Sequence, residues 1–363
     1  FSEPREKANL LIDQLRHRNF ILCDRGSDIY GFVHRTFLEY FCAVEIVHRF
    51  EKQRTLTFEQ LRDEVFGNHW QDETLHEVLK LICGAIDPKF SRELIKFLVG
   101  FERKKDRFKN LFLAAECLSM IRNRLGLTSI ETPLLLSLQS LINFDLDYEY
   151  DRDRNRDAIS LVQSIQSQAV STIASIWEAE TTYLWLKKCV STNKNWAVCI
   201  TATQEIAQRW KNHTNTLRWL KECINESENV HVRSTAVQEL ANGWKDDPDT
   251  SQILKSCISD KDWRVRSATL KGLSLYWGDD PDLFRISCDS VLSDPFNRKY
   301  DFQINPRKMA LEALLTHYPT HPKTLELLRD RASNDPDKQL RQWAQEQLKM
   351  QNVKQEMEES SDG

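Results

Sequence analysis

Apolar residues in the second half of the chain recur at helical spacing and with a fixed period. In one segment they fall at Val232, Ala236, Val237 and Leu240, on a single face of a helix. A tryptophan follows each such segment at intervals of 33, 34 and 33 residues: Trp177, Trp210, Trp244 and Trp277. A period of this size indicates a solenoid, in which each unit buries its apolar faces against its neighbours. The pattern predicts an all-α solenoid of helix pairs over residues 158–350.

The turns between the paired helices carry aspartates and a proline. Asp247-Pro248 in the third unit and Asp280-Pro281 in the fourth place an aspartate and a proline at the start of the second helix. Aspartate is a favoured N-cap residue, and proline suits the first helical position. Capping accounts for both residues, so we interpret these aspartates as helix caps rather than as metal ligands.

A short motif within the repeats points to a family. Val-Arg-Ser occurs at 232–234 and at 265–267, the second time shortly after Asp262. This resembles the Asp-x-x-Val-Arg pattern of HEAT repeats. The resemblance implies that arginine and aspartate side chains form a ladder between neighbouring units, with Arg233, Arg266 and Asp262 at the matching positions. Cys199 occupies the arginine position of the preceding unit, which weakens that rung.

Two further features of the repeats bear on binding. We expect the tryptophans to pack between units rather than to form exposed stacking platforms for nucleic acid, because the net charge is −4. We expect the periodic cysteines Cys189, Cys223 and Cys257 to be small buried apolar residues. An insertion at residues 295–305 departs from the regular path and is a candidate contact loop.

The first fifty residues have a different pattern. An amphipathic segment, two short β-type segments around Gly26, and a second amphipathic segment predict a helix, a hairpin and a helix. This order is typical of a small winged-helix domain over residues 1–50. In its second helix, Phe37, Tyr40, Phe41 and Val44 are spaced to point inward.

Residues 32–43 read Phe-Val-His-Arg-Thr-Phe-Leu-Glu-Tyr-Phe-Cys-Ala. They resemble the Phe-x-His-x-x-Phe-x-Glu-Tyr/Phe-x-Ala stretch of NACHT-type STAND NTPases, in particular bacterial members of cyanobacterial type. In that family the stretch lies in a winged-helix domain after the nucleotide-binding module, and its histidine faces the phosphates of bound ADP. The resemblance implies this role for His34; the alternative is that His34 caps or packs at the strand-to-helix junction.

The chain contains no Gly-x-x-x-x-Gly-Lys-Ser/Thr phosphate loop. The resemblance therefore implies that a NACHT domain lies upstream of Phe1 and acts on this chain in cis. ADP or ATP with magnesium would be a cofactor of the longer protein, and the part present here would have no cofactor and no enzyme activity. The first residue is Phe and not Met, so we expect the chain to be a piece of a longer protein, with a processed product as the alternative.

The remaining segments connect these two regions. Residues 51–145 predict an α-helical connector with irregular repeats. Residues 146–157 are densely charged and are expected to be a linker, with an acidic contact for a basic partner as the alternative. Residues 351–363 end in Glu-Met-Glu-Glu-Ser-Ser-Asp-Gly and are expected to be a disordered acidic tail.

Charge and cysteine usage narrow the partners. Residues 1–60 carry nine Lys or Arg and nine Asp or Glu, so the electrostatic attraction that drives binding to a phosphate backbone is weak there. Nine scattered cysteines without a Cys-x-x-Cys pair fit a reducing compartment, and no apolar run is long enough for a membrane helix. We therefore expect a cytoplasmic protein that binds neither membrane nor nucleic acid.

Three functions remain open. The first is the regulatory or sensor region of a NACHT-type signalling NTPase, with antiphage defence as a candidate role. Its solenoid would bind a protein partner or ligand, its winged helix would couple binding to the upstream nucleotide-binding domain, and the protein could oligomerise on activation. The second is a stand-alone HEAT-repeat scaffold or adaptor, including proteins with phycobiliprotein-lyase-like repeats. The third is an enzyme in its own right, which is disfavoured because the sequence shows no nucleophile–base arrangement, metal spacing or phosphate loop.

Overall fold

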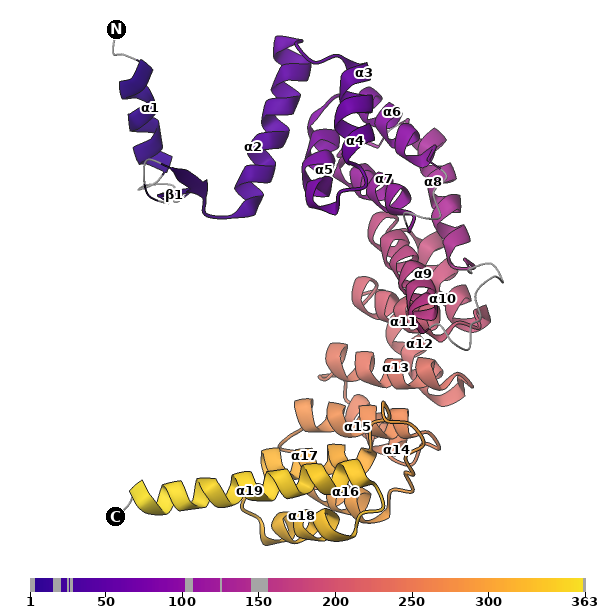
Figure 1. The fold of residues 1–363 in the computed structure, drawn as a ribbon. Coiled ribbons are helices and arrows are strands. Elements are labelled where there is room, and N and C mark those ends of the chain that lie inside the picture. Colours follow the sequence, from indigo (N-terminus) through magenta and orange to yellow (C-terminus); the bar gives the residue numbers. More distant parts are fainter. Residues whose placement is uncertain are drawn as a thin grey trace. The chain divides into compact units, whose positions relative to one another are not determined.

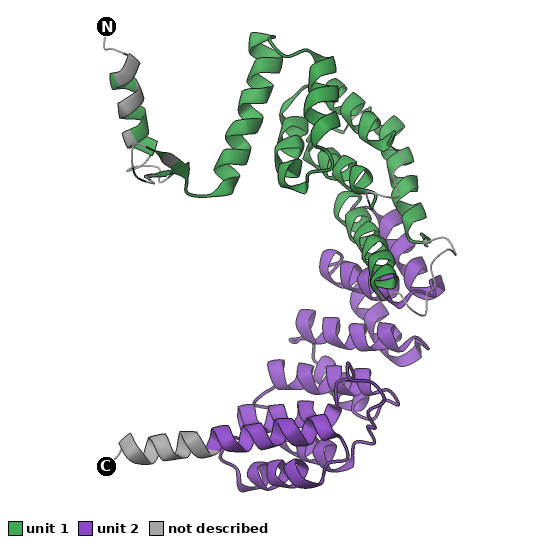
Figure 2. Ribbon diagram, in the orientation of Figure 1, with its two compact units in different colours: residues 1–177 green, residues 178–363 purple. Residues whose placement is uncertain are grey.

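A computed structural model describes residues 4–15, 21–24, 26, 29–101, 107–124, 126–144 and 156–361. The chain divides into two compact units, residues 1–177 and residues 178–363 (Figure 2). Both are built mainly from helices, as predicted, with a single two-stranded sheet in the part that the structure describes. The boundary differs from the prediction, since the helix at 156–176 belongs to the first unit rather than to the solenoid that was expected to begin at 158.

The first unit begins with the predicted helix, hairpin and helix (Figure 1). These are α1 (Pro4–Asp13), the antiparallel strands β1 (Leu22–Asp24) and β2 (Tyr30–Phe32), and α2 (Arg35–His48). Gly26, in the turn between the strands, has φ +89°, a conformation that favours glycine.

The packing of α2 differs from the prediction. This helix contacts α5 (His76–Ala85), and Ala43 is its buried residue. Tyr40, Phe41 and Val44 were expected to point inward, but they are 53%, 40% and 44% exposed. Of the predicted inward face, only Phe37 is half-buried, and the side chains at the other three positions are exposed. That part of the winged-helix prediction is wrong.

The rest of the first unit forms two rows of helices. In the first row α2, α5, α7 (Lys109–Met120) and α9 (Arg156–Ile176) contact one another in succession. In the second row α6 (Pro88–Val99) contacts α8 (Thr128–Leu141). Two short helices, α3 (Phe58–Gln60) and α4 (Gly67–His69), lie between α2 and α5 in the chain. The irregular repeats expected over residues 51–145 are thus stacked helices that continue the row begun by α2.

Local chemistry explains where several of these helices start. Thr57 and Gln60 form a capping box, in which the Thr57 hydroxyl accepts from the Gln60 amide at 3.2 Å and the Gln60 side chain accepts from the Thr57 amide at 3.0 Å. Asp87 caps α6, with Pro88 at its first position. A 3₁₀ turn over Glu73–Leu75 leads into α5 at His76.

The second unit also has two rows of helices. In the first row α11, α13, α15 and α17 contact one another in succession, and the alternate helices lie beside them in a second row. Its helices are α10 (Glu180–Thr192), α11 (Trp196–Arg209), α12 (Thr216–Glu226), α13 (Val230–Gly243), α14 (Thr250–Cys257), α15 (Trp263–Tyr276), α16 (Pro281–Ser293), α17 (Pro306–His317), α18 (Pro322–Asn334) and α19 (Lys338–Ser361). Val232, Ala236, Val237 and Leu240 are buried, as their spacing predicted.

The sequence predicted a charged linker at residues 146–157 and a disordered acidic tail at residues 351–363. Residues 145–155, which make up most of the predicted charged linker, lie outside the described residues. Residues 351–361 were expected to be disordered, but they continue α19 as far as Ser361. Glu, Lys, Gln and Met are good helix formers, so their local propensity accounts for this continuation.

Candidate functional site

Three buried arginine–aspartate pairs join successive repeats of the second unit. Each guanidinium makes two hydrogen bonds to one carboxylate, at 3.0 and 3.1 Å, 2.6 and 2.9 Å, and 2.8 and 2.9 Å respectively. The pairs are Arg233–Asp260, Arg266–Asp294 and Arg307–Asp335. The remaining guanidinium nitrogen donates to backbone carbonyls of the preceding interhelical turn. The ladder therefore fixes both the spacing of the repeats and the turns between them.

Asp262 has a different place from the one that the HEAT resemblance implied. It caps α15 by accepting from the Arg264 amide at 2.8 Å, and its carboxylate pairs with the Arg264 guanidinium at 3.2 Å. The acid of the ladder lies two residues earlier, at Asp260, which also accepts from the Asp262 amide. The carboxylate of Asp262 is thus used by the backbone amide and the guanidinium of Arg264 within its own helix.

Sequence reasoning thus missed four members of the ladder. Arg307 and the three carboxylates lie among the buried or half-buried residues, and each acid follows its arginine by 27 or 28 residues: Asp260, Asp294 and Asp335. That fixed offset was the available signal. Burial acts to raise the pKa of Asp260, but the hydrogen bonds from Arg233 and from the Asp262 amide, together with the positive charges nearby, outweigh it, and the pKa lies below its usual value.

The rung at Cys199 has no charge pair. Its thiol lies 3.3 Å from the carbonyl oxygen of Asn193, in the turn before α11. This contact takes the place of the arginine-to-carbonyl bonds in the later repeats. Burial raises the pKa of the Cys199 thiol, so the neutral form is favoured.

A second set of ion pairs involves the opposite turns of the repeats. The Lys221 ammonium lies 2.9 Å from Asp247 and 3.3 Å from Asp249, and Lys255 lies 2.8 Å from both Asp280 and Asp282. The hydrogen bond that Lys255 donates to Asp280 raises the pKa of Lys255, and the one that it donates to Asp282 raises it further. The paired aspartates therefore bind a lysine of the preceding second-row helix.

The capping role predicted for these aspartates is correct in one repeat and wrong in the other. Asp280 caps α16 by accepting from the Asp282 amide at 2.8 Å, with Pro281 at the first helical position. In the preceding repeat α14 begins only at Thr250, because Asp247 accepts from the Asp249 amide and the Thr250 hydroxyl and so organises a turn before the helix.

The tryptophans end the first-row helices. Trp210, Trp244 and Trp277 are the residues that directly follow α11, α13 and α15, and each is half-buried. Tyr318 takes the same position after α17, a fourth aromatic residue that the interrupted period concealed. The Lys211 ammonium lies 5.8 Å from the Trp244 ring, which is a contact between neighbouring repeats. Trp177 follows α9 at the end of the first unit.

The periodic cysteines are buried on the second row of helices. Burial raises the pKa of the Cys189, Cys223 and Cys257 thiols to about 11, 12 and 11. Thiols with such pKa values remain protonated near neutral pH and are poor nucleophiles. Their position and protonation are those of small apolar core residues.

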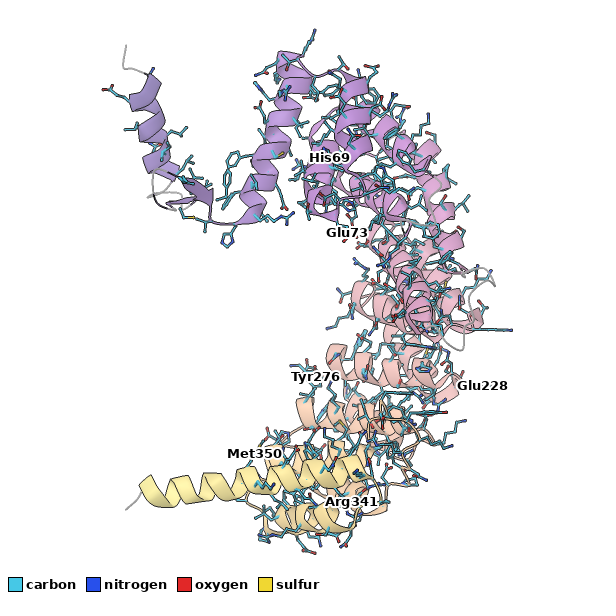
Figure 3. All side chains as sticks on the ribbon, viewed as in Figure 1. His69, Glu73, Glu228, Tyr276, Arg341 and Met350 are labelled. Atoms are coloured by element: carbon cyan, nitrogen blue, oxygen red, sulfur yellow. The ribbon has the colours of Figure 1, made fainter. Side chains whose placement is uncertain are left out.

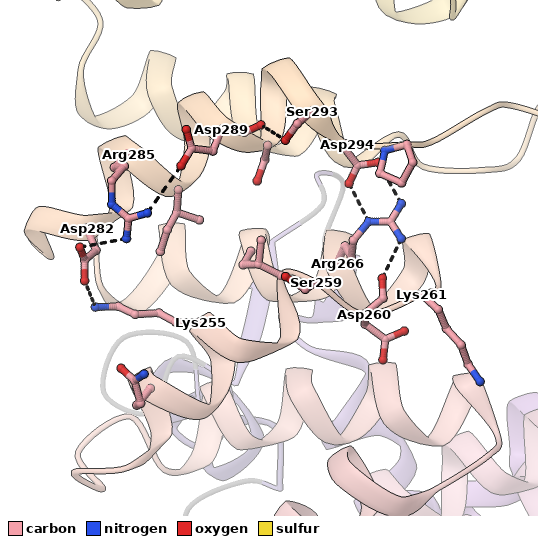
Figure 4. Close-up of a pocket in the computed structure, with 15 residues that line it drawn as sticks. Lys255, Ser259, Asp260, Lys261, Arg266, Asp282, Arg285, Asp289, Ser293 and Asp294 are labelled. Atoms are coloured by element: carbon pink, nitrogen blue, oxygen red, sulfur yellow. Dashed lines mark hydrogen bonds and ion pairs between the residues drawn. The ribbon is translucent and has the colours of Figure 1, made fainter.

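A groove with a volume of about 620 Å³ lies between α14 and α16 (Figure 4). Its lining includes the ladder pair Arg266–Asp294 and the pair formed by Lys255 and Asp282. Arg285 reaches both Asp282 and an exposed carboxylate on α16 (Figure 4). Most of the charges in the groove are thus already neutralised by each other.

The insertion at residues 295–305 is a well-connected loop beside this groove. Phe296 is buried and lies edge-on to Trp263 at a ring distance of 6.1 Å. The Arg298 guanidinium makes two hydrogen bonds to Asp337, at 2.9 and 2.8 Å, and donates to backbone carbonyls within the loop. Beyond these anchors, Tyr300 and Phe302 are exposed and stack on each other at 5.5 Å.

His34 lies in the first unit, directly before α2. Its side chain is exposed and makes no capping hydrogen bond, and its ring is 6.5 Å from that of Phe37. The next residue, Arg35, pairs with Glu39 at 2.6 Å and donates to the carbonyl oxygen of Thr74. The phosphate-facing role of His34 stays a prediction.

Comparisons with known proteins bear on the repeats. A family model described as HEAT repeats matches residues 183–274, which run from α10 to α15. No curated protein and no solved structure matches the chain. None of the helices in the described part of the chain is long and apolar enough to cross a membrane. Over residues 183–274 the chain is similar to HEAT repeats in sequence, and the stacked helix pairs and charge ladder form an all-α solenoid.

Proposed function

We propose that the second unit is a solenoid scaffold that binds a protein partner. The observation that carries this proposal is the ladder of buried Arg–Asp pairs, which joins α13 to α17 and fixes the turns between them. Such a ladder holds a long surface in one shape, so little conformational entropy is lost when a partner binds. HEAT repeats commonly mediate protein interactions, which supports the same conclusion.

The chemistry of the groove favours binding over catalysis. Lys255 and Arg266 are paired with carboxylates, and the pKa of Asp282 is lowered, first of all by its hydrogen bond from Lys255. A general acid or base needs a pKa near the working pH, and a carboxylate held by two cations is stabilised in its charged form. These side chains therefore serve the structure of the repeats.

Affinity capture with the intact chain from extracts of its native cells tests the proposal. We expect a defined protein to co-purify and to bind again when both purified components are mixed. The Asp294→Asn variant, which breaks a rung, should retain less of this protein than the Asp289→Asn control, whose carboxylate is exposed. The scaffold function would be contradicted if no captured protein bound the purified chain again.

A second candidate function rests on the first unit. The exposed apolar side chains of α2, which include Tyr40, Phe41 and Val44, lie on the helix that follows His34. This arrangement supports the proposal that a NACHT domain encoded upstream packs here and that ADP or ATP with magnesium binds near His34. In that longer protein, partner binding on the solenoid would be relayed to the NTPase, in a signalling or antiphage role.

The longer coding sequence tests this second candidate. If a phosphate loop is encoded upstream, we expect His34→Ala in the full-length protein to lower its ADP content or to make signalling constitutive. His48→Ala is the matched control, because this histidine is exposed at the other end of α2. Equal ADP content and signalling in both variants would refute the role of His34.

A further inference from the structure

The loop at residues 295–304 exposes apolar surface that its own fold does not use. Phe302 is 73% exposed and Tyr300 is 62% exposed, and their rings stack with an interplanar angle of 7°. Ile304 is also exposed. By contrast, Phe296 at the start of the loop is buried, so closing the loop onto the solenoid requires one aromatic residue and not three.

The loop is held in this shape from within and from both sides. The Gln303 side-chain oxygen accepts from the Lys299 amide at 2.6 Å and from the Tyr300 amide at 2.9 Å. The Ser267 hydroxyl on α15 donates to the carbonyl of Ile304 at 3.5 Å, and Gln339 on α19 donates to Asp301 at 3.3 Å.

Arg298 supplies the strongest anchor of the loop. Its two hydrogen bonds to Asp337 are joined by one from Asn305 to the same carboxylate at 2.8 Å. Asp337 is buried, and burial acts to raise its pKa, but the bonds from Arg298 and Asn305 outweigh this effect and lower it. The aromatic pair is therefore presented by a preorganised loop, for which binding costs little ordering entropy.

The edge of the solenoid around this loop carries exposed lysines. Lys261 lies in the turn between α14 and α15, Lys299 in the loop between α16 and α17, and Lys338 at the start of α19. Each of these connections leads from a second-row helix to the next first-row helix, so all three lie along one edge of the unit. Within the described residues none of these three lysines has a carboxylate within ion-pair distance.

Most acids in these turns are already paired with arginines: Asp260, Asp294 and Asp335 with the ladder arginines, Asp262 with Arg264, and Asp337 with Arg298. Asp301 is exposed in the loop, and Glu228 lies in an equivalent turn two connections earlier. Glu228 and Tyr276 lie on opposite sides of the second unit, which marks the two edges of the solenoid (Figure 3). The turns of the other edge carry the aspartates at 246–249 and 279–282. The lysine edge is thus the one suited to an acidic ligand.

We propose that this surface, formed by Lys261, Lys299, Tyr300, Phe302, Ile304 and Lys338, binds an extended acidic peptide segment of the protein partner. An apolar side chain of the peptide packs against Tyr300 and Phe302, and its carboxylates face the lysines. Neighbouring packed helices lie about 8–10 Å apart, and an extended chain rises about 3.3 Å per residue. Acidic residues at every third position of the peptide would therefore match successive lysines.

A nucleic acid fits this edge less well. A phosphate backbone places charges far closer together than one lysine per repeat, and the net charge of the chain is −4.

Peptide selection on the intact chain tests this inference, which rests on the proposed scaffold function. The probe is a display library of random twelve-residue peptides, followed by the fluorescently labelled synthetic peptide that is most enriched. We expect enrichment of peptides with an aromatic residue and several acids. We expect Phe302→Ser and Lys261→Glu each to weaken the affinity of the labelled peptide at least tenfold, and salt to weaken it as well.

Matched substitutions elsewhere on the unit serve as controls. Leu275→Ser removes an exposed apolar side chain near the end of α15, and Lys245→Glu reverses an exposed charge on the opposite edge. Both should leave the affinity within twofold. Because Phe302 and Lys261 are exposed, their variants should keep the thermal stability of the parent chain.

Several outcomes would overturn the inference. The first is a selection that enriches no acidic aromatic peptide, and the second is an affinity that neither Phe302→Ser nor Lys261→Glu changes. The third is tighter binding of a labelled single-stranded RNA of twenty nucleotides at this surface. If the protein captured from native extracts is retained equally by the Phe302→Ser and Lys261→Glu variants, the scaffold function stands and this surface is wrong.

Discussion

The pair between Arg266 and Asp294 offers the sharpest test of the charge ladder. Asp294→Asn keeps the side-chain shape and an oxygen that can accept from the Phe296 amide, but it removes the negative charge. The Arg266 side chain is 7% exposed and that of Asp294 is 4% exposed, so water cannot replace the lost carboxylate. The substitution leaves the buried Arg266 guanidinium without a counter-charge. The side-chain NH₂ of the asparagine, a hydrogen-bond donor, also faces an N–H donor of the guanidinium.

The expected cost is large on the scale of a single substitution. Removing one partner of a buried, hydrogen-bonded ion pair costs about 3–5 kcal/mol, because the other charge stays buried. Asp289→Asn is the matched control on the same helix, since Asp289 is 63% exposed and lies 3.5 Å from an equally exposed Arg285. An exposed pair of this kind contributes about 0–1 kcal/mol.

Hydrogen exchange measured by mass spectrometry can assign this loss to individual helices. Solenoids can open locally, so a single unfolding free energy is not sufficient. We expect the opening free energy of peptides from α15, α16 and α17 to fall by about 3–5 kcal/mol in Asp294→Asn, with partial recovery when Arg266→Met removes the unpaired cation. A loss below about 1 kcal/mol, equal to that of Asp289→Asn, would refute the reasoning.

Two other substitutions probe the packing and charge of the solenoid. Gly278→Ala should lower the free energy of unfolding in urea by about 1–3 kcal/mol, because the new Cβ would lie 2.4 Å from the His317 ring, which a 2.8 Å contact to the Ser274 carbonyl holds in place. The control is Gly243→Ala, which should be neutral or stabilising because the nearest atom to its new Cβ lies at 3.8 Å. Equal effects of the two substitutions would contradict the close contact at Gly278. Glu239→Gln should raise stability by about 1 kcal/mol at pH 7, because burial raises the pKa of Glu239 and penalises its charged form. A carboxyl group whose pKa is higher in the folded state than in the unfolded state lowers stability as the pH rises from the unfolded-state pKa through the folded-state pKa. The gain from Glu239→Gln should therefore vanish below about pH 4, where the carboxyl group is protonated in both states. A gain that persists at lower pH, or an equal gain in Glu205→Gln, would contradict the assignment.

The architecture of the second unit could be predicted because its signals are periodic. The apolar residues of α13 and the aromatic residues that end the first-row helices repeat at the period of one helix pair, and every copy supports the same interpretation. The insertion before α17 breaks that period, which is why Tyr318 and Arg307 were missed.

The charge partners were harder to predict than the helices. Aspartates near a helix start can cap their own helix or reach another repeat, and residue type alone does not separate Asp260 from Asp262. The prediction of how α2 packs was wrong for a related reason. Helical spacing shows that apolar residues share a face, but it does not show that another element covers that face, as Tyr40 and Phe41 illustrate.

Hydrogen exchange of the intact chain with and without its purified protein partner tests the central claim most directly. The account predicts protection in two stretches of the second unit, residues 258–266 and residues 294–305, with the Phe302→Ser variant losing it. Protection confined to α2 of the first unit, or no protection in the second unit at a saturating partner concentration, would contradict the account.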